Sequence, residues 1–304
     1  MGSHLTEALL DGGADVSIYV RGNSINGTFT YSLKNTAHLE KRFRAIITGD
    51  IASNDAIDLI RQDASDYIFH LAADAYVPNS FSHPVEVFET NLMGTLNVLT
   101  AARGLKKIKR VVCTSSSEIY GTALYAPIDE EHPLNPTSPY AASKVAADRA
   151  AFSYWKTFGL PVALIRPFNT FGPRHTYDVI PKFISLALKN KPLLVHGTGK
   201  QTRDFTYVDD MIRAFLIMGS HPKAVGRAVN FGTGKDVDIK TIAEKIVRLS
   251  GSSSPILHTS ERQAEVKRLI CDFRLARKLF SFKPTVSVDE GLRRNIDWAR
   301  RRGQ

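Results

Sequence analysis

Residues 109–121 read Lys-Arg-Val-Val-Cys-Thr-Ser-Ser-Ser-Glu-Ile-Tyr-Gly, and residues 140–144 read Tyr-Ala-Ala-Ser-Lys. The first stretch is an apolar run that ends in hydroxyl side chains and one carboxylate, Glu118. The second stretch spaces a phenol and an ammonium four residues apart, so a helix would present Tyr140 and Lys144 on one face. A nearby ammonium favours the phenolate, which makes Tyr140 a candidate general base near neutral pH. Together the two stretches indicate proton and hydride chemistry on an alcohol carbon.

Short apolar runs alternate with helical patterns around these stretches. We expect strands at residues 15–20, 44–48, 66–71, 109–114 and 162–166, and helices at residues 55–61, 85–103 and 140–158. This order predicts an α/β fold, a doubly wound parallel sheet of Rossmann type with helices on both faces. Ligands of such sheets bind at the carboxyl ends of the strands.

The regular pattern loosens after Arg166, where prolines and glycines become frequent. We expect one further strand at residues 224–231 and amphipathic helices at residues 239–249 and 288–300. The C-terminal third therefore predicts a second, smaller lobe.

The first ten residues read as a helix with no strand before it. A doubly wound sheet normally opens with a strand and a glycine-rich turn that brings a phosphate to a helix N-terminus. We therefore expect the first strand and most of the glycine-rich loop to be missing from this sequence. Residues 1–4, Met-Gly-Ser-His, are also compatible with an expression-tag scar.

The composition bounds the class of protein. Of 304 residues, 43% are hydrophobic and 23% are charged, which is ordinary for a globular protein. No apolar run approaches the roughly 20 residues of a membrane span, and no secretory leader is recognisable. We expect no metal site, because neither the two cysteines nor the nine histidines show metal-ligand spacing. Cys113 and Cys271 are expected to be inert thiols, which fits a reducing, cytoplasmic location.

The net charge of +10 leaves two interpretations open. One is nucleic-acid binding. The other, which we favour, is a basic enzyme that binds anionic nucleotides, because the charges are dispersed and no basic stripe is interleaved with aromatic residues.

The ordered motifs of the chain resemble the extended short-chain dehydrogenase/reductases, in particular the NAD-dependent epimerase/dehydratase family that acts on nucleotide sugars. The resemblance runs from Gly2 to about Trp298, and its motifs are residues 70–73, 91–95, 114–121, 140–144, 166–169 and 201–210. The chain looks most similar to the nucleotide-sugar 4,6-dehydratases. The resemblance implies a dinucleotide-binding domain over residues 1–170 and about 203–235, and a nucleotide-sugar-binding lobe over residues 171–202 and 236–304.

The resemblance implies an NAD cofactor. Gly2 alone matches the glycine-rich loop, at its last glycine. Arg21 follows the expected strand 15–20, near where NAD-selective members place a carboxylate. Arg21 could pair with a 2′-phosphate, which would favour NADP as the cofactor. Alternatively, its side chain faces solvent and has no role in cofactor binding. The other cofactor contacts that the resemblance implies are Asp50, Ile51, Leu71, Ala72, Ala73, Thr114, Tyr140, Lys144 and Pro167.

The implied reaction is a dehydration without net redox change. Tyr140 takes the proton of the sugar 4-hydroxyl while hydride leaves C4 for the nicotinamide, and Lys144 assists Tyr140 and holds the ribose. Ser116 hydrogen-bonds the reacting oxygen. Glu118 removes the proton at C5, water leaves from C6 and the hydride returns there. Ser117 matches the GDP-mannose type, which leaves Glu118 as both base and acid.

The resemblance also implies a nucleotide-diphosphate sugar as substrate and a homodimer formed through the helices at 85–103 and 140–158. The implied substrate contacts are Tyr76, Val77, Ser80, Asn169, Val179, Ile180, Lys182, Arg203 and Arg262. A nucleotide-sugar 4-epimerase, a decarboxylase of uronic-acid nucleotides and a cofactor-free, non-catalytic member remain alternatives. Each of these residues also has an interpretation without function. Glu118 would then be a surface residue on a loop, and Arg203 and Arg262 would form surface ion pairs.

Overall fold

The computed structural model describes residues 1–25 and 28–303, which form two compact units. Unit 1 comprises residues 1–115, 139–165 and 212–228, and unit 2 comprises residues 116–138, 166–211 and 229–304. The boundary at Ser115 separates residues that are adjacent in the sequence. The residues predicted to do the chemistry therefore divide into two groups, one in each unit.

A parallel sheet is the framework of unit 1. Strand β5 (Tyr67–His70) pairs with β6 (Arg110–Thr114), and β6 pairs with β7 (Val162–Pro167), both in parallel. All residues of β7 and the first four of β6 are buried, as in a sheet that is covered on both faces. Strand β12 (Ala228–Phe231) completes the order β12-β7-β6-β5.

A second parallel pair lies in the same unit. Strand β1 (Ser17–Val20) pairs with β4 (Ala45–Thr48) over their full lengths. Within the described part of the chain this pair is not hydrogen-bonded to the four-stranded sheet, so β1 and β5 are both edge strands. Strands β2 (Gly22–Ile25) and β3 (Thr28–Tyr31) form a separate antiparallel hairpin.

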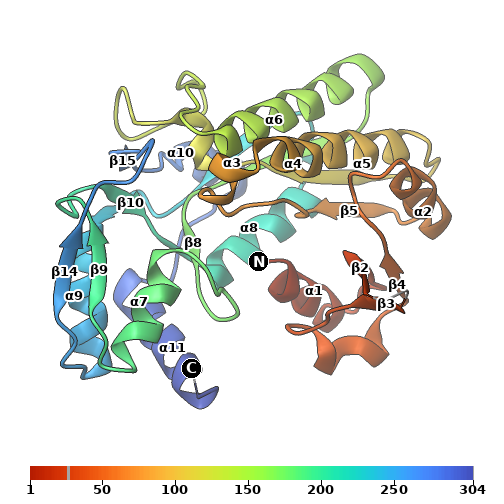
Figure 1. The fold of residues 1–304 in the computed structure, drawn as a ribbon. Helices are drawn as coiled ribbons and strands as arrows, with labels where there is room; N and C mark the ends of the chain where they lie inside the picture. The colour runs from red at the N-terminus through yellow and green to blue at the C-terminus, as the bar shows by residue number, and fades with distance from the viewer. Residues whose placement is uncertain (26–27, 304) are drawn as a thin grey trace. The chain divides into compact units, whose positions relative to one another are not determined.

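The helix predicted at residues 85–103 is interrupted. It begins as α4 (Pro84–Phe88), passes through a π-helical turn at Glu89–Met93 and continues as α5 (Gly94–Arg103). Figure 1 shows α4 and α5 running beside α6 (Pro139–Phe158), with which they pack. The helical prediction is therefore confirmed, with one π turn that periodicity does not distinguish from an α turn.

Two shorter helices complete the packing around the sheet strands of unit 1. Helix α1 (Gly2–Asp11) buries Leu10 with Val16 and Leu39 beside β1. Helix α2 (Asp55–Asp63) packs on α5. Both helices lie where the sequence predicts them.

Unit 2 is assembled from short strands and helices. They are β8 (Thr170–Phe171), β9 (Leu193–His196), β10 (Thr202–Asp204), β11 (Thr206–Tyr207), β13 (Asp236–Asp238), β14 (Ile256–Thr259), β15 (Arg268–Leu269), α7 (Val179–Ala187), α9 (Ile239–Ser250), α10 (Arg274–Phe280) and α11 (Val288–Arg301). The strands pair as β13-β10-β15, β11-β8 and β14-β9. Helix α8 (Val208–Ser220) begins in unit 2 and ends in unit 1.

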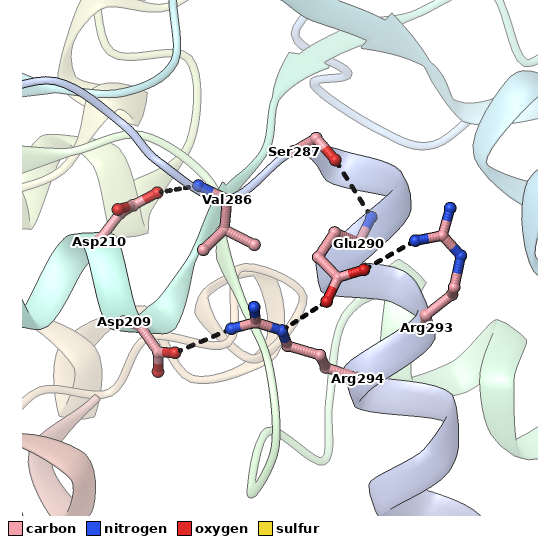
Figure 2. A network of polar contacts seen from close by, with 7 residues as sticks. All are labelled: Asp209, Asp210, Val286, Ser287, Glu290, Arg293 and Arg294. Atoms are coloured by element: carbon pink, nitrogen blue, oxygen red, sulfur yellow. Dashed lines mark hydrogen bonds and ion pairs between the residues drawn. The ribbon is translucent and has the colours of Figure 1, made fainter.

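The start of α11 is fixed to the start of α8 by a polar network, shown in Figure 2. Asp210, which is fully buried, accepts the backbone N–H of Val286 at 3.0 Å. Ser287 caps α11 by accepting the N–H of Glu290 at 3.2 Å, and Glu290 accepts a 2.8 Å hydrogen bond from Arg294. The last aspartate of the motif at 201–210 therefore has a structural role.

The other predicted elements are confirmed to within two residues, apart from the strand expected at residues 224–231. It begins only at Ala228, because Pro222–Ala224 form a 3₁₀ turn. Proline fixes its backbone in a turn conformation and lacks an N–H for a sheet.

Gly121 ends the 3₁₀ turn Ser117–Tyr120 at a position where a side chain does not fit. Its φ is +64°, and a Cβ there would lie 2.1 Å from the carbonyl oxygen of Asn135. Gly251, after α9, has nearly the same φ of +63° but open space where a Cβ would lie. A substitution at Gly251 therefore tests only the cost of the left-handed backbone, whereas one at Gly121 also includes the cost of the steric clash.

We predict that Gly251→Ala costs about 1 kcal/mol of unfolding free energy, the cost of a left-handed conformation for alanine. Gly121→Ala adds a clash with backbone and should cost about 2 kcal/mol more. Urea unfolding of both variants and the parent measures this. Equal losses for the two variants would show that the Asn135 contact relaxes without cost.

Candidate functional site

Tyr140 and Lys144 lie in the first two turns of α6, with only 7% and 5% of their surfaces exposed. The Lys144 ammonium donates a hydrogen bond to the carbonyl oxygen of Thr114, the last residue of β6. Burial lowers the pKa of Lys144 to about 8, although Cys113 and Asp148 favour its charged form. The structure thus joins the strand end and the helix that the sequence singled out.

Asn91, in the π-helical turn, ties α6 to the loop after β5. Its Nδ2 donates to Ser143 Oγ at 2.9 Å and to the Asp74 carbonyl at 3.0 Å, and its Oδ1 accepts the Asp74 N–H at 2.8 Å. Ser143 Oγ donates in turn to the Tyr140 carbonyl at 2.7 Å. Sequence reasoning missed this residue as a site residue. The available signal was an amide side chain within a largely apolar helical run.

Two hydroxyls at the end of β6 lack a partner. Thr114 Oγ1 and Ser115 Oγ are buried and make no hydrogen bond to the described residues. An unsatisfied buried hydroxyl costs about 1–3 kcal/mol, so these atoms point to a polar group that binds there. Together with the Lys144 ammonium they form a donor and acceptor set that fits the hydroxyl and amide groups of a nicotinamide nucleoside.

A cavity of about 1310 Å³ in unit 1 contains part of the predicted cofactor site. The predicted cofactor residues that line it are Gly2, Ile51, Leu71 and Ala72. Ala73 and Thr114 are not among its lining residues, and Pro167 belongs to unit 2. The cavity therefore accounts for only part of the predicted set.

Arg21 and Asp50, two further predicted cofactor residues, pair with each other. Arg21 Nη2 lies 3.7 Å from Asp50 Oδ2, and the side chains are 73% and 47% exposed. Asp50 Oδ1 also accepts the N–H of Ala52 at 2.9 Å. The carboxylate partly neutralises the arginine that a 2′-phosphate would need.

The residues after Ser115 begin unit 2 with an anchored turn. Ser116 Oγ accepts the N–H of Glu118 at 3.2 Å and so caps the 3₁₀ turn. Tyr120, at the end of the turn, is fully buried and donates to Asn230 Oδ1 at 2.7 Å. Arg166 donates to the Tyr120 hydroxyl at 2.8 Å. These bonds hold the turn that carries Glu118 in one conformation.

Glu118 stands in an acidic environment with one arginine. Burial raises the pKa of its carboxyl, nearby Arg203 opposes the rise, and Glu265 and Asp178 add to it. Arg203 is itself held by Glu265, Nη2 to Oε1 at 2.8 Å, and by two backbone carbonyls. Ser117, beside Glu118, is buried. A carboxyl whose pKa lies above its usual value suits a group that must both take and return a proton.

The predicted substrate contacts of unit 2 lie in different environments. Asn169 Oδ1 is buried and has no hydrogen-bond partner among the described residues. In α7, Ile180 is fully buried, Val179 is half-buried and Lys182 is exposed. Arg262 is exposed on the loop after β14. The structure gives a packing role to Ile180 and leaves an unused acceptor at Asn169.

The predicted substrate contacts of unit 1 lie on one short segment. Ser80 is fully buried and its Oγ donates to the Val77 carbonyl at 2.7 Å, while the Tyr76 N–H donates to Asp74 at 3.4 Å. Asp74 also accepts a bond from Asn79. Because Asp74 is the partner of Asn91, this segment and the start of α6 belong to one hydrogen-bond network.

Other kinds of site are not seen in the described residues. They contain no group of three histidine, cysteine or acidic side chains that could hold a metal ion. No helix in the described ranges combines the length and apolar character needed to cross a membrane. Cys113 and Cys271 are buried free thiols.

We predict a pH dependence of stability from Lys144. Its pKa is about 8 in the folded chain and 10.5 in its reference state, so the cost of burying the ammonium is fully present below pH 8 and is lost as the pH rises toward 10.5. Lys144→Met should therefore be more stable than the parent near neutral pH, by up to about 3 kcal/mol. This advantage should shrink as the pH rises.

Unfolding of parent and variant at several pH values measures the difference. Lys106→Met removes an exposed lysine and is the control for loss of charge. A constant difference between Lys144→Met and the parent across this pH range would contradict the prediction.

Comparison with known proteins places these features in a family. A family model described as GDP-mannose 4,6 dehydratase matches residues 1–295. A putative UDP-glucose 4-epimerase of Methanocaldococcus jannaschii is 31% identical, over 98% of this chain and 94% of the relative. UDP-glucuronic acid decarboxylase 1 of Xenopus tropicalis is 33% identical, over 99% of this chain and 70% of the relative.

The fold also matches a solved structure. The crystal structure of DesIV, a dTDP-glucose 4,6-dehydratase from Streptomyces venezuelae solved with NAD bound, superposes with a TM-score of 0.89. It is 28% identical, and the match covers 99% of this chain and 94% of that chain. The sheet of unit 1 is accordingly a Rossmann-type sheet, and the chain belongs to the GDP-mannose 4,6-dehydratase family of nucleotide-sugar dehydratases and epimerases.

Proposed function

We propose that the chain is an NAD-dependent nucleotide-sugar 4,6-dehydratase that forms a 4-keto-6-deoxy sugar nucleotide. The observation that carries the proposal is Glu118, a carboxyl whose pKa is raised by burial, two residues after Ser116. It lies four residues after Thr114, whose carbonyl holds Lys144. The relatives include a dehydratase solved with NAD, which supports the reaction type and the cofactor.

The cofactor supplies a hydride acceptor that becomes a hydride donor within one turnover. Lys144, Thr114 and Ser115 would hold its nicotinamide half, because they offer an ammonium and two unpartnered hydroxyls. Arg21 and Asp50 would lie at the adenosine half. We propose NAD rather than NADP, because Asp50 already partners Arg21.

The first proton transfer falls to Tyr140. Its phenolate takes the proton of the sugar 4-hydroxyl as the C4–H bond gives up its hydride, and the 4-hydroxyl becomes a ketone. Lys144, one turn further along α6, favours the phenolate. Ser116 would donate a hydrogen bond to the developing carbonyl oxygen.

The second proton transfer falls to Glu118. The 4-ketone acidifies C5–H, Glu118 takes that proton, and the C6–O bond breaks with loss of water. Because Ser117 beside it is a hydroxyl rather than an acid, Glu118 also supplies the proton to the leaving oxygen. C6 would then receive the hydride that the cofactor stored, and C5 a proton equivalent to the one that Tyr140 took from the 4-hydroxyl, so the net change is loss of one water.

The remaining assignments follow from this reaction. Arg203, Arg262 and Asn169 would bind the diphosphate and the sugar, with residues 171–202 and 236–304 as the nucleotide-sugar lobe. Residues 1–170 and about 203–235 would be the dinucleotide-binding domain. Two buried free thiols support a reducing compartment such as the cytoplasm.

We predict that Glu118→Gln separates the two halves of the reaction. Incubated with UDP-, GDP- or dTDP-hexoses, the parent should yield a product lighter by one water, as measured by mass spectrometry. The variant should lose this product by about 10²–10⁴-fold, the usual worth of a general base. It should still transfer hydride, seen as absorbance of reduced nicotinamide.

Tyr140→Phe is the matched control and should lose both signals. A product of unchanged mass would identify an epimerase instead, and loss of carbon dioxide from a uronic-acid nucleotide would identify a decarboxylase. Denatured parent protein should release about one dinucleotide per chain. If the protein released no dinucleotide and formed no product, the result would support the alternative of a cofactor-free, non-catalytic family member.

We further propose a homodimer formed by α4, α5 and α6. Val85, on α4, is 68% exposed and Met93, in the π-helical turn, is 43% exposed, so these helices present apolar surface to solvent. In Figure 1 they lie side by side along one edge of unit 1. Two copies packed through these helices would form a four-helix bundle and cover both side chains.

We predict that Val85→Glu combined with Met93→Glu weakens dimerisation about tenfold or more, because two charges would be buried at the interface. Light scattering at micromolar concentration measures the mass. Leu194→Glu changes a leucine of unit 2 that is 49% exposed and should leave the dimer intact. A monomeric parent would refute the dimer.

A further inference from the structure

Three buried polar side chains of unit 2 meet at one hydroxyl. Tyr120 is fully buried, and its hydroxyl donates a hydrogen bond to Asn230 Oδ1 at 2.7 Å. The same hydroxyl accepts a hydrogen bond from Arg166 at 2.8 Å. Asn230 is fully buried and Arg166 is 3% exposed, so this cluster is closed to solvent. None of these side chains takes part in the proposed reaction.

Glu130 adds a carboxylate to the cluster. Its Oε1 accepts the backbone N–H of Asn230 at 2.8 Å, and its backbone carbonyl accepts a bond from Arg166 at 3.5 Å. Asn230 Nδ2 donates to the Ile128 carbonyl at 3.2 Å, so Asn230 is bound to the Glu130 segment at two points. Glu130, Asn230 and Tyr120 thus form a chain of hydrogen bonds that ends on the turn carrying Glu118.

The Glu130 carboxyl lies where its charge is disfavoured. Burial raises its pKa to about 7, and the nearby carboxylate of Asp272 adds to the rise. The N–H of Asn230 and the charge of Arg166 oppose burial without outweighing it. The titratable and charged groups around Glu130 are Arg166 on β7, Asp272 before α10, the Tyr120 hydroxyl and, in its own segment, Asp129, Glu131 and His132.

The charge of Glu130 controls how firmly this chain of bonds is held. A hydrogen bond from an N–H to a carboxylate is roughly twice as strong as one to a neutral acceptor. Loss of the charge therefore weakens the hold on Asn230, and through Asn230 Oδ1 the hold on Tyr120. Gly121, directly after Tyr120, donates its N–H to the Glu118 carbonyl at 3.1 Å. The position of Tyr120 consequently bears on the turn that carries Glu118.

We propose that Glu130 is a positioning residue for Glu118, which its charged carboxylate holds in place through Asn230 and Tyr120. The inference rests on the proposed role of Glu118 as the second base. Protonation of Glu130 loosens the turn and slows proton removal from C5, whereas hydride transfer, which depends on Tyr140, continues.

The cost of this charge argues for positioning. The folded chain gains stability as the pH falls from about 7 toward 4.5, because there Glu130 keeps a proton that it has released in the unfolded chain. The charge therefore opposes folding at neutral pH, which fits a carboxylate that serves the site rather than stability.

Variants of Glu130 separate charge from hydrogen bonding. Glu130→Gln keeps an oxygen acceptor for Asn230 but cannot ionise, and Glu130→Ala removes the acceptor as well. Glu131→Gln, which changes the exposed carboxylate next to it, is the matched control. All forms carry Glu118→Gln, so that Glu118 itself does not titrate. The readout is hydrogen exchange at the amides of Gly121 and Asn230, measured by NMR at about pH 6 and about pH 8 and corrected for intrinsic exchange.

Protection of these amides should rise about fivefold from the lower to the higher pH, both with Glu130 intact and in Glu131→Gln, because the bond to Asn230 becomes charge-assisted. Glu130→Gln should show the lower protection at both pH values, and Glu130→Ala should show less still. Protection that does not depend on pH when Glu130 is intact would overturn the proposal. So would protection that still rises with pH in Glu130→Gln.

Product formation with Glu118 intact measures the effect on the proposed reaction. Glu130→Gln should slow water loss about fivefold at the higher pH and much less at the lower pH, with unchanged KM and unchanged hydride transfer. An equal loss at both pH values would indicate structural damage and overturn the positioning role. If the parent forms no product, the proposed function fails, and hydrogen exchange still decides whether Glu130 holds the turn.

Discussion

One hydrogen bond, from the Lys144 ammonium to the Thr114 carbonyl, is the contact on which the proposed catalytic part of unit 1 depends. A buried ammonium is costly, and the lowered pKa of Lys144 expresses that cost. The bond links the last residue of β6 to the second turn of α6, and so fixes how far Tyr140 stands from the strand end. Asn91 and Ser143 hold the same helix turn through its backbone. The position of Tyr140 is thus set by polar contacts as well as by packing.

The turn that carries Glu118, the proposed second base, is built differently. Glu118 sits on a short turn that is capped by Ser116, anchored by Tyr120 and ended by a glycine with no room for a side chain. Its acidic neighbours and burial outweigh the one nearby arginine, and the result is a raised pKa. The pKa of Lys144 is therefore lowered and the pKa of Glu118 is raised, so both move toward neutral pH. Such shifts suit proton transfer at physiological pH.

Most of the fold could be predicted from the sequence. The strands and helices around the two opening stretches follow from apolar runs and their period, and the structure has them within two residues. The π-helical turn at Glu89–Met93 could not be predicted, because its sequence continues the helical pattern. The late start of β12 could have been predicted, because Pro222 lies just before the expected strand and favours a turn there. The lobe boundaries and the roles of the site residues remain predictions.

The sequence by itself determined the fold class, the family and the identity of the candidate acid and base groups, because these depend on residue type and local spacing. Only the tertiary structure decided which partners those groups have. Arg203, expected at the substrate phosphates, is held by Glu265, and Arg21 lies beside Asp50. It also decided that β1 and β5 line one cavity without pairing with each other in the part of the chain that the structure describes. Such contacts join residues far apart in the chain, and burial and charge act through space, so no local pattern encodes them.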